Sequence, residues 1–168
     1  MTPSRRPTPQ DELLLQVAVG DEAAAREAWA TAARGLDIGA LPPQAHAVLP
    51  LLAAALPRLG YRFADQPRLA GVRKRTWYLN MQRAQALAPV IQRLTRERLE
   101  PVVTGGFAVL LLAGDLSLRQ LFDVEVALPA DAERRRAAYA VLVASGWARS
   151  SARRDGALLD LHAERWAR

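Results

Sequence analysis

A mixed α/β (α+β) fold is predicted by a change of texture along the chain. From Thr8 to Leu99, alanine, leucine and arginine dominate and apolar residues recur at spacings of three and four, which is typical of helices. After Glu100, short β-branched or alternating runs take turns with helical runs, which predicts strands between helices. The length of 168 residues suits one ordinary domain, and with 51% apolar residues the chain can bury a core. We therefore expect a helical amino-terminal part, residues 1–99, packed as one body with an α/β core, residues 100–168, that holds a small mixed sheet.

The composition excludes several classes of functional site. The chain has no cysteine, which excludes disulfides, thiolate metal sites, iron–sulfur clusters and thiol nucleophiles. Its 2 histidines, His46 and His162, are too few for a zinc site built on several imidazoles. No apolar run approaches the ~20 residues that cross a bilayer, and no signal-type apolar segment follows the amino terminus. A soluble, cytoplasmic protein without a membrane partner is expected.

The charge of the chain is a weak indication of function. The formal net charge is +6, and Lys74 is the single lysine among the 23 basic residues, a bias typical of codon composition. An excess of positive charge still attracts polyanions and nucleotide phosphates. Aromatic residues make up only 6%, and no basic stripe is interleaved with stacking rings. Nucleic-acid binding through the arginine surface is therefore the weakest of the partner hypotheses.

Two helices are predicted first. Pro9 opens a helix that Gly20 closes, and Asp21 caps a second helix that runs to Gly35. Short polar caps and glycine stops are strong local signals, because they satisfy the unpaired backbone groups of helix ends.

Longer helical runs follow, and prolines interrupt them. A third helix is expected to begin near 42–43. Because it contains Pro50 and Pro57, we expect a kink in it or a division into two shorter helices. A long helix is expected over 67–98, with an interruption at Pro89. The apolar residues available for its buried face are Val72, Trp77, Tyr78, Met81, Leu87, Val90, Ile91 and Leu94. Its cations are Arg73, Lys74, Arg75 and Arg83, which extend into solvent or reach toward a bound triphosphate.

The carboxyl-terminal part alternates strands and helices. The predicted elements are, in order, a strand over 101–104, a helix over 107–112, a strand over 122–128, a helix over 129–143, and two strands over 147–152 and 157–162. Gly114 ends the first of these helices, and Ser145 with Gly146 ends the second.

Two acids in the strand predicted over 122–128 are the most informative feature. Residues two apart in a strand share a face, so Asp123 and Glu125 project side by side while Phe122, Val124 and Val126 face the core. Adjacent carboxylates repel one another unless a divalent cation bridges them, and Mg²⁺ prefers carboxylate oxygens.

A third acid and a glycine turn agree with this interpretation. Asp160 is an isolated carboxylate in an otherwise apolar strand. Upstream, Thr104, Gly105 and Gly106 join a strand to a helix, where backbone N–H groups can approach a phosphate that a Cβ would obstruct. Together these residues indicate metal-assisted phosphoryl or nucleotidyl transfer.

The region from Pro101 to Trp166 resembles the polymerase-β-type nucleotidyltransferase superfamily, in particular a bacterial group of uncharacterised nucleotidyltransferases. The matching motifs are Thr104-Gly105-Gly106-Phe107-Ala108, Arg119-Gln120-Leu121-Phe122-Asp123-Val124-Glu125, Gly146-Trp147 and Leu159-Asp160-Leu161-His162. The helical segments Leu49-Pro50-Leu51-Leu52 and Arg75-Thr76-Trp77-Tyr78 are also similar to the lead-in of that group.

The resemblance implies a Mg²⁺-dependent enzyme that moves a nucleoside monophosphate from an NTP to an acceptor. ATP is the expected NTP. The acceptor is unknown, and a protein or peptide is one candidate. The metal ligands and catalytic residues that it implies are Asp123, Glu125 and Asp160, with Asp160 as general base. The nucleotide-binding residues are Thr104, Gly105, Gly106 and Arg119.

The chain departs from the group's pattern in three places, which keep a second class of function open. Gly105 stands where the group commonly has lysine, Glu125 replaces the usual second aspartate, and the chain ends soon after Asp160. The alternative is a catalytically degenerate descendant that acts as a binding or scaffold partner in a peptide or natural-product biosynthesis pathway.

Each candidate residue also has a structural interpretation. Asp123 and Glu125 can be surface acids of an edge strand, and His162 a structural histidine. The ion-pair alternatives are Asp160 with Arg149 or Arg153 across the predicted hairpin, and Arg119 with Asp115 or Asp123. The cluster Arg134, Arg135 and Arg136 is expected to be solvated.

Overall fold

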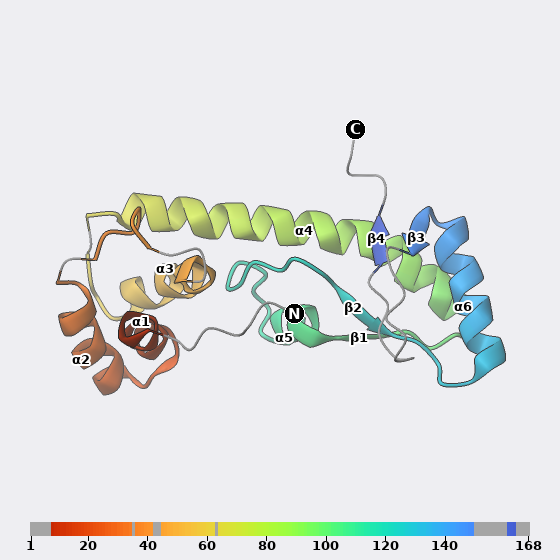
Figure 1. Ribbon diagram of the computed structural model, residues 1–168, viewed down its shortest axis with the longest axis horizontal. Coiled ribbons are helices and arrows are strands. Elements are labelled where there is room, and N and C mark those ends of the chain that lie inside the picture. Colours follow the sequence, from red (N-terminus) through yellow and green to blue (C-terminus); the bar gives the residue numbers. More distant parts are fainter. Residues whose placement is uncertain (1–7, 35, 42–44, 63, 150–160, 164–168) are drawn as a thin grey trace. The chain divides into compact units, whose positions relative to one another are not determined.

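The computed structural model describes residues 8–34, 36–41, 45–62, 64–149 and 161–163 (Figure 1). Helices predominate among these residues, and the strands form two antiparallel pairs, β1 with β2 and β3 with β4. The mixed α+β class predicted from the sequence is confirmed at this level. In place of one mixed sheet, the described strands form two separate two-stranded sheets.

The chain divides into two compact units by its internal contacts. Unit 1 comprises Met1–Leu79 with Leu116–Gln120, and unit 2 comprises Asn80–Asp115 with Leu121–Arg168. The dividing line lies inside a single helix, α4. The parts expected from the sequence, 1–99 and 100–168, stay a prediction.

The first two helices of unit 1 begin where the sequence predicts, at Pro9 and after the Asp21 cap, and Thr8 is the N-cap of the first. In α1, Pro9–Val19, the Thr8 hydroxyl accepts a hydrogen bond from Asp11 N at 3.2 Å, while Thr8 N donates to Asp11 Oδ2 at 2.8 Å. In α2, Glu22–Ala32, Ala24 N donates to Asp21 Oδ1 at 2.9 Å. Both predicted helix starts are confirmed.

The predicted division of the next helical run is confirmed at Pro50, whereas Pro57 lies inside α3 and does not divide it. A 3₁₀ turn, Ala45–Val48, precedes α3, Leu49–Arg58. Pro50 lies in the first turn of α3, where its missing N–H has no intrahelical role. The core of unit 1 is formed by α1, α2, α3 and the start of α4, and its most completely buried side chains include Leu14, Val17, Trp29, Leu52, Leu56 and Leu69.

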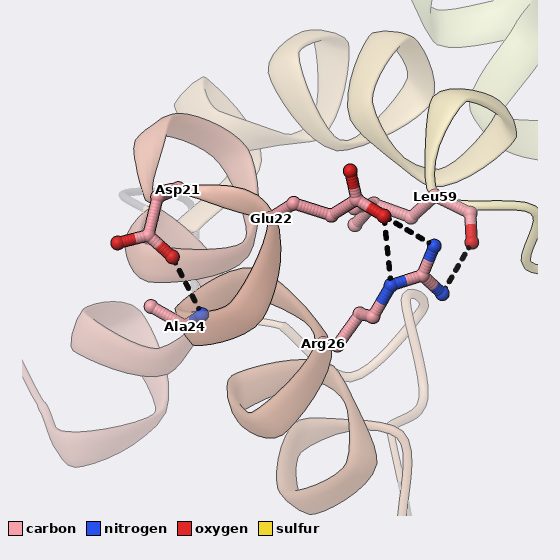
Figure 2. A network of polar contacts seen from close by, with 5 residues as sticks. All are labelled: Asp21, Glu22, Ala24, Arg26 and Leu59. Carbon is pink, nitrogen blue, oxygen red and sulfur yellow. Dashed lines mark hydrogen bonds and ion pairs between the residues drawn. The ribbon is translucent and has the colours of Figure 1, made fainter.

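Arg26 joins α2 to the end of α3 within unit 1 (Figure 2). Its guanidinium donates to Glu22 Oε1 through Nη2 at 2.7 Å and to the Leu59 carbonyl through Nη1 at 2.9 Å. It also lies over the ring of Tyr61, 5.8 Å from the centroid. The hydrogen bond to Glu22 is the main cause that raises the pKa of Arg26 above its usual value.

The long helix α4, Gln66–Arg96, has 31 residues and passes through Pro89 without interruption. Its buried face contains two polar side chains, Thr76 and Asn80, among the apolar residues Leu69, Leu87, Val90 and Leu94. No helix among the described residues is long and apolar enough to cross a membrane.

The predicted buried face of α4 is wrong at two aromatic residues. Trp77 and Tyr78, which the apolar stripe should contain, are 45% and 55% exposed. Thr76 and Asn80, four residues apart, occupy the inward direction instead, and each helical step rotates the next residue by about 100°. Trp77 and Tyr78 therefore point away from the buried face.

Unit 2 follows the predicted order of strands and helices. Its elements are β1 Val102–Thr104, α5 Gly105–Leu112, β2 Glu125–Ala127, α6 Ala132–Ala144, β3 Trp147–Arg149 and β4 Leu161–Ala163. Gly146, with φ of +82°, follows α6 and confirms the predicted stop. The core of unit 2 consists of Val90, Leu94, Leu99, Ala138, Val141 and Leu142, with Leu128 and Trp147 packed against it.

Candidate functional site

The candidate site in unit 2 begins where β1 passes directly into α5. Gly105 is the first residue of the helix and has φ of +64°, a left-handed conformation that glycine adopts without strain. Thr104 occupies the N-cap position, but its side chain makes no capping hydrogen bond. The first N–H groups of a helix have no intrahelical acceptor, so this junction presents donors that the Thr104 hydroxyl does not satisfy.

The pairing of β1 with β2 brings Glu125 to this junction. The two strands are antiparallel, and Thr104 is the register partner of Glu125. A Cβ built on Gly105 would lie 2.6 Å from Glu125 Oε2 and 2.7 Å from its Cδ, so the half-buried carboxylate lies directly against Gly105. No hydrogen bond or ion pair of Glu125 is found within the part of the chain that the structure describes. A negative charge beside the start of a helix is favourable, because the helix dipole is positive there.

Asp123 lies outside the strand in which it was expected. Strand β2 covers only Glu125–Ala127, because its partner β1 offers three residues for pairing. Asp123 is exposed on the segment that precedes the strand, and Phe122, expected in the core, is 79% exposed. The same-face argument for Asp123 and Glu125 therefore does not apply, since it requires both residues in one strand.

The predicted alternation is confirmed farther along this segment. Val124, Val126 and Leu128 line an apolar pocket together with residues of α4 and α6 and with Trp147. Because successive strand residues point to opposite sides, Glu125 lies on the face of β2 away from this pocket. The apolar packing of the neighbouring valines thus positions the carboxylate at the glycine turn.

The other predicted site residues are placed elsewhere or lie outside the described residues. Arg119 belongs to unit 1 and its side chain is exposed. Asp160, with Arg153, lies outside the described residues. His162 is in β4, where its backbone is the register partner of Ala148. Within 8–34, 36–41, 45–62, 64–149 and 161–163, no group of three or more His, Cys, Asp or Glu side chains could hold a metal ion.

The basic cluster of α6 is only partly solvated. Arg134 and Arg135 are half-buried, whereas Arg136 is exposed. Arg134 Nη2 donates to the Arg98 carbonyl at 2.6 Å and forms an ion pair with Glu100 Oε2 at 3.2 Å. The expectation of a fully solvated cluster is therefore wrong for Arg134, which holds the segment before β1.

Sequence reasoning missed two buried polar residues that hold the segments leading to the site. Within unit 1, Arg73 Nε donates to the buried Ser117 hydroxyl at 2.7 Å. Within unit 2, Leu121 N donates to Oδ1 of the fully buried Asn80 at 3.2 Å. For Asn80 the available signal was its helical spacing from Thr76 in an apolar stripe, since such residues are buried only with partners. Ser117 lies outside the helices and gave no such signal.

The chemistry available at the site is that of one half-buried carboxylate, one exposed carboxylate and a glycine turn with backbone donors. Carboxylates are the kind of group that binds divalent cations, and backbone N–H groups at a helix start are the kind that binds phosphates. Comparison with protein families, with curated proteins and with solved structures finds no match for this chain.

Proposed function

We propose that unit 2 is a nucleotidyltransferase-like core that binds a nucleoside triphosphate with Mg²⁺. The acceptor hydroxyl would lose its proton and its oxygen would bond to the α-phosphorus, while the bond from that phosphorus to the β-phosphate breaks and pyrophosphate leaves. One observation carries this proposal: the register of β1 and β2 brings the Glu125 carboxylate against the Gly105 turn at the start of α5. The carboxylate supplies a ligand for the metal, and the backbone N–H groups beside it supply donors for the phosphate that the metal binds.

The residues present fit Mg²⁺. This ion is commonly held in phosphate-transferring proteins by one or two carboxylates, while substrate phosphates and waters complete its shell. Glu125, which forms no ion pair with another described residue, would be one protein ligand, and Asp123 is the second carboxylate that the resemblance implies. When bound, the ion would offset the negative charge of the phosphates.

Each of the remaining roles is assigned to a residue of this chain. The N–H groups that begin α5 at Gly105 and Gly106 would donate to phosphate oxygens, and the Thr104 hydroxyl, which does not cap the helix, would do the same. The resemblance implies that Asp160 would accept the proton of the acceptor hydroxyl. ATP is the expected nucleotide, and the acceptor is a hydroxyl group of a protein, a peptide or a small molecule.

The position of Glu125 also favours the second candidate, a degenerate protein that acts as a scaffold. Without a cation, the negatively charged Glu125 carboxylate lies at the start of α5, and there it repels an incoming phosphate. In that case the chain would bind a partner of a peptide or natural-product assembly pathway with or without nucleotide.

The two candidates predict opposite effects of one substitution. We would titrate ATP, GTP, CTP and UTP by calorimetry, with and without Mg²⁺, into wild type, Glu125→Gln and Asp123→Asn. Glu133→Gln is the matched control, because it removes an exposed acid at the start of α6. An active site predicts Mg²⁺-dependent binding that Glu125→Gln abolishes, that Asp123→Asn weakens and that the control retains.

A degenerate site predicts the reverse. The wild type would then bind no nucleotide. The Glu125→Gln variant would bind nucleotide weakly and without Mg²⁺, because the substitution removes the negative charge that repels the phosphates. Mg²⁺-dependent binding that is equal in all four proteins would contradict the proposed site.

A further inference from the structure

The part of helix α4 that lies in unit 1 carries positive charge, and α4 contains no acidic residue. Helix α4 has 31 residues, among which there is no aspartate or glutamate. Its first half contains Arg68, Arg73, Lys74 and Arg75. Helices of water-soluble proteins commonly mix both signs of charge on their exposed face. The absence of acids indicates a surface that attracts anions.

Two large aromatic side chains lie on the same stretch and are exposed. Trp77 and Tyr78 are 45% and 55% accessible, and they are the large hydrophobic residues exposed on α4 within the described chain. Tryptophan is highly buried on average, so exposure of these adjacent rings calls for a physical explanation. A ring that stacks on a ligand is one such explanation.

Helical geometry brings the charges and the rings together. Lys74 lies three residues before Trp77 and four before Tyr78, and Arg75 lies three before Tyr78, so these side chains are neighbours on the helix surface. Lys74 and Arg75 are exposed and make no hydrogen bond or ion pair with any other described residue. Arg73, in contrast, is held by Ser117. We call Lys74, Arg75, Trp77 and Tyr78 the α4 patch.

We propose that the α4 patch binds single-stranded nucleic acid, with Lys74 and Arg75 at phosphates and with Trp77 and Tyr78 stacked on bases. Binding of single strands without sequence preference combines cations that follow the backbone with aromatic rings on which bases stack. The patch supplies both within about one turn of a helix, so the expectation that no basic run lies beside stacking rings is wrong here. The bases of a duplex are already stacked inside, so a duplex would use the charges but not the rings.

A membrane surface fits the patch less well. A helix that lies in a bilayer interface buries a continuous apolar face, whereas the apolar face of α4 is buried inside the protein. Two adjacent rings do not form such a face. The proposal concerns unit 1 and requires no metal, so it stands independently of the nucleotide site proposed in unit 2.

The test is fluorescence anisotropy of the full chain with labelled single-stranded oligo(U) and oligo(dT), in the presence of a metal chelator. The wild type should bind both probes, with an affinity that falls as salt rises. The slope of log affinity against log salt changes by about 0.7 for each phosphate contact of a single strand. Lys74→Ala with Arg75→Ala should therefore reduce the slope by about 1.4.

A charge-matched control separates the patch from the net charge. Arg96→Ala with Arg136→Ala also removes two exposed arginines that make no ion pair with another described residue, and it should leave the salt slope unchanged. Equal losses in the two double variants would overturn the proposal, because binding would then follow net charge alone.

The rings are tested in the same way. Trp77→Ala and Tyr78→Ala should each weaken binding about 10-fold or more, as expected for the loss of a stacked base, without changing the salt slope. Phe122→Ala, which removes another exposed ring, should have no effect. Because both patch rings are exposed, these variants should keep the circular dichroism spectrum of the wild type.

Polyphosphate and lipid vesicles test whether the α4 patch binds a ligand other than a single-stranded nucleic acid. Inorganic polyphosphate that displaces the oligonucleotide at equal phosphate concentration, together with full binding by Trp77→Ala, would show a site for charge alone and overturn the proposal. Binding of the wild type to phosphatidylserine vesicles, with no binding to either oligonucleotide, would assign the patch to a membrane and overturn it as well.

Discussion

The Glu125 carboxylate lies against the Cα of Gly105, in the place where any other residue at position 105 would have its Cβ. Such a Cβ would lie 2.6 Å from Glu125 Oε2, and Gly105 itself has φ of +64°. The backbone conformation favours glycine at this position, and a Cβ there would also require the end of the flexible Glu125 side chain to shift.

Gly105→Ala tests which of the two constraints dominates. An L-residue in the left-handed conformation costs about 1–2 kcal/mol. Gly114→Ala is the matched control, because Gly114 has φ of +68° and a Cβ there would meet no atom within 4 Å. We expect similar losses of unfolding free energy in urea for the two variants, since the end of the Glu125 side chain can move aside. A much larger loss for Gly105→Ala would mean that the carboxylate is held rigidly in place.

The same pair of variants separates stability from function. Gly105→Ala should displace the Glu125 carboxylate and weaken Mg²⁺-dependent nucleotide binding, whereas Gly114→Ala should leave that binding unchanged. Calorimetric titration of both variants provides the measurement. Equal nucleotide binding by the two would argue against Glu125 as a metal ligand.

Asn80 is predicted to be important for stability although it lies far from any predicted catalytic residue in sequence. Its Oδ1 accepts the hydrogen bond of Leu121 N at 3.2 Å, and its side chain is fully buried. Asn80→Leu leaves this buried N–H without an acceptor, which should lower the free energy of unfolding by about 1–3 kcal/mol. Gln85→Leu, at an exposed position of α4, should change it by less than about 0.5 kcal/mol.

The cap of α2 provides a more local prediction. Asp21→Ala removes the acceptor for Ala24 N and should cost about 1 kcal/mol, whereas Asp21→Asn keeps an acceptor and should cost less. Thermal unfolding followed by circular dichroism measures both variants. Equal destabilisation by alanine and asparagine would indicate that the charge at the helix start, and not the hydrogen bond, stabilises α2.

Arg26 should contribute to stability across the neutral pH range. The hydrogen bond to Glu22 raises the pKa of Arg26 in the folded protein. The contribution of Arg26 to the free energy of unfolding is therefore fully present below the pKa that Arg26 has in the unfolded chain. It is lost only as pH rises through the pKa that Arg26 has in the folded protein, in strongly alkaline solution. Arg26→Gln should lower Tm more than Arg93→Gln. Arg93 pairs with Glu97 at the same spacing, at 3.3 Å, whereas Arg26 also binds the Leu59 carbonyl.

Added salt distinguishes the parts of this network. Salt screens an exposed ion pair but not a hydrogen bond to a backbone carbonyl. The difference in Tm between wild type and Arg26→Gln should therefore persist at high salt, while the difference for Arg93→Gln should shrink. Loss of both differences at high salt would show that the Leu59 contact contributes nothing measurable.

Sequence reasoning succeeded where the signal is local. The helix start at Pro9, the cap at Asp21, the division of the helix at Pro50 and the stop at Gly146 were all predicted, because each depends on backbone groups within one turn of the residue. The order of strands and helices after Glu100 was predicted for the same reason.

One local signal was also misleading, because α4 continues through Pro89, where an interruption was predicted. The other errors lie where a distant segment decides. Strand β2 is only as long as its partner β1 allows, so Asp123 lies outside it and Phe122 is exposed. The inward face of α4 was assigned to its aromatic residues, whereas the structure buries Thr76 and Asn80 there. A polar residue is buried only when a partner satisfies it, and for Asn80 that partner is the backbone of Leu121.

The sequence by itself determined the helices, their ends, the residues that form the glycine turn and the excess of positive charge, because these follow from local backbone chemistry and composition. Only the tertiary structure decided that Glu125 lies against Gly105 and that Trp77 and Tyr78 face outward beside Lys74 and Arg75. Strand register and the choice of a buried helix face depend on which segments pack together, and that free energy is distributed over residues far apart in the chain.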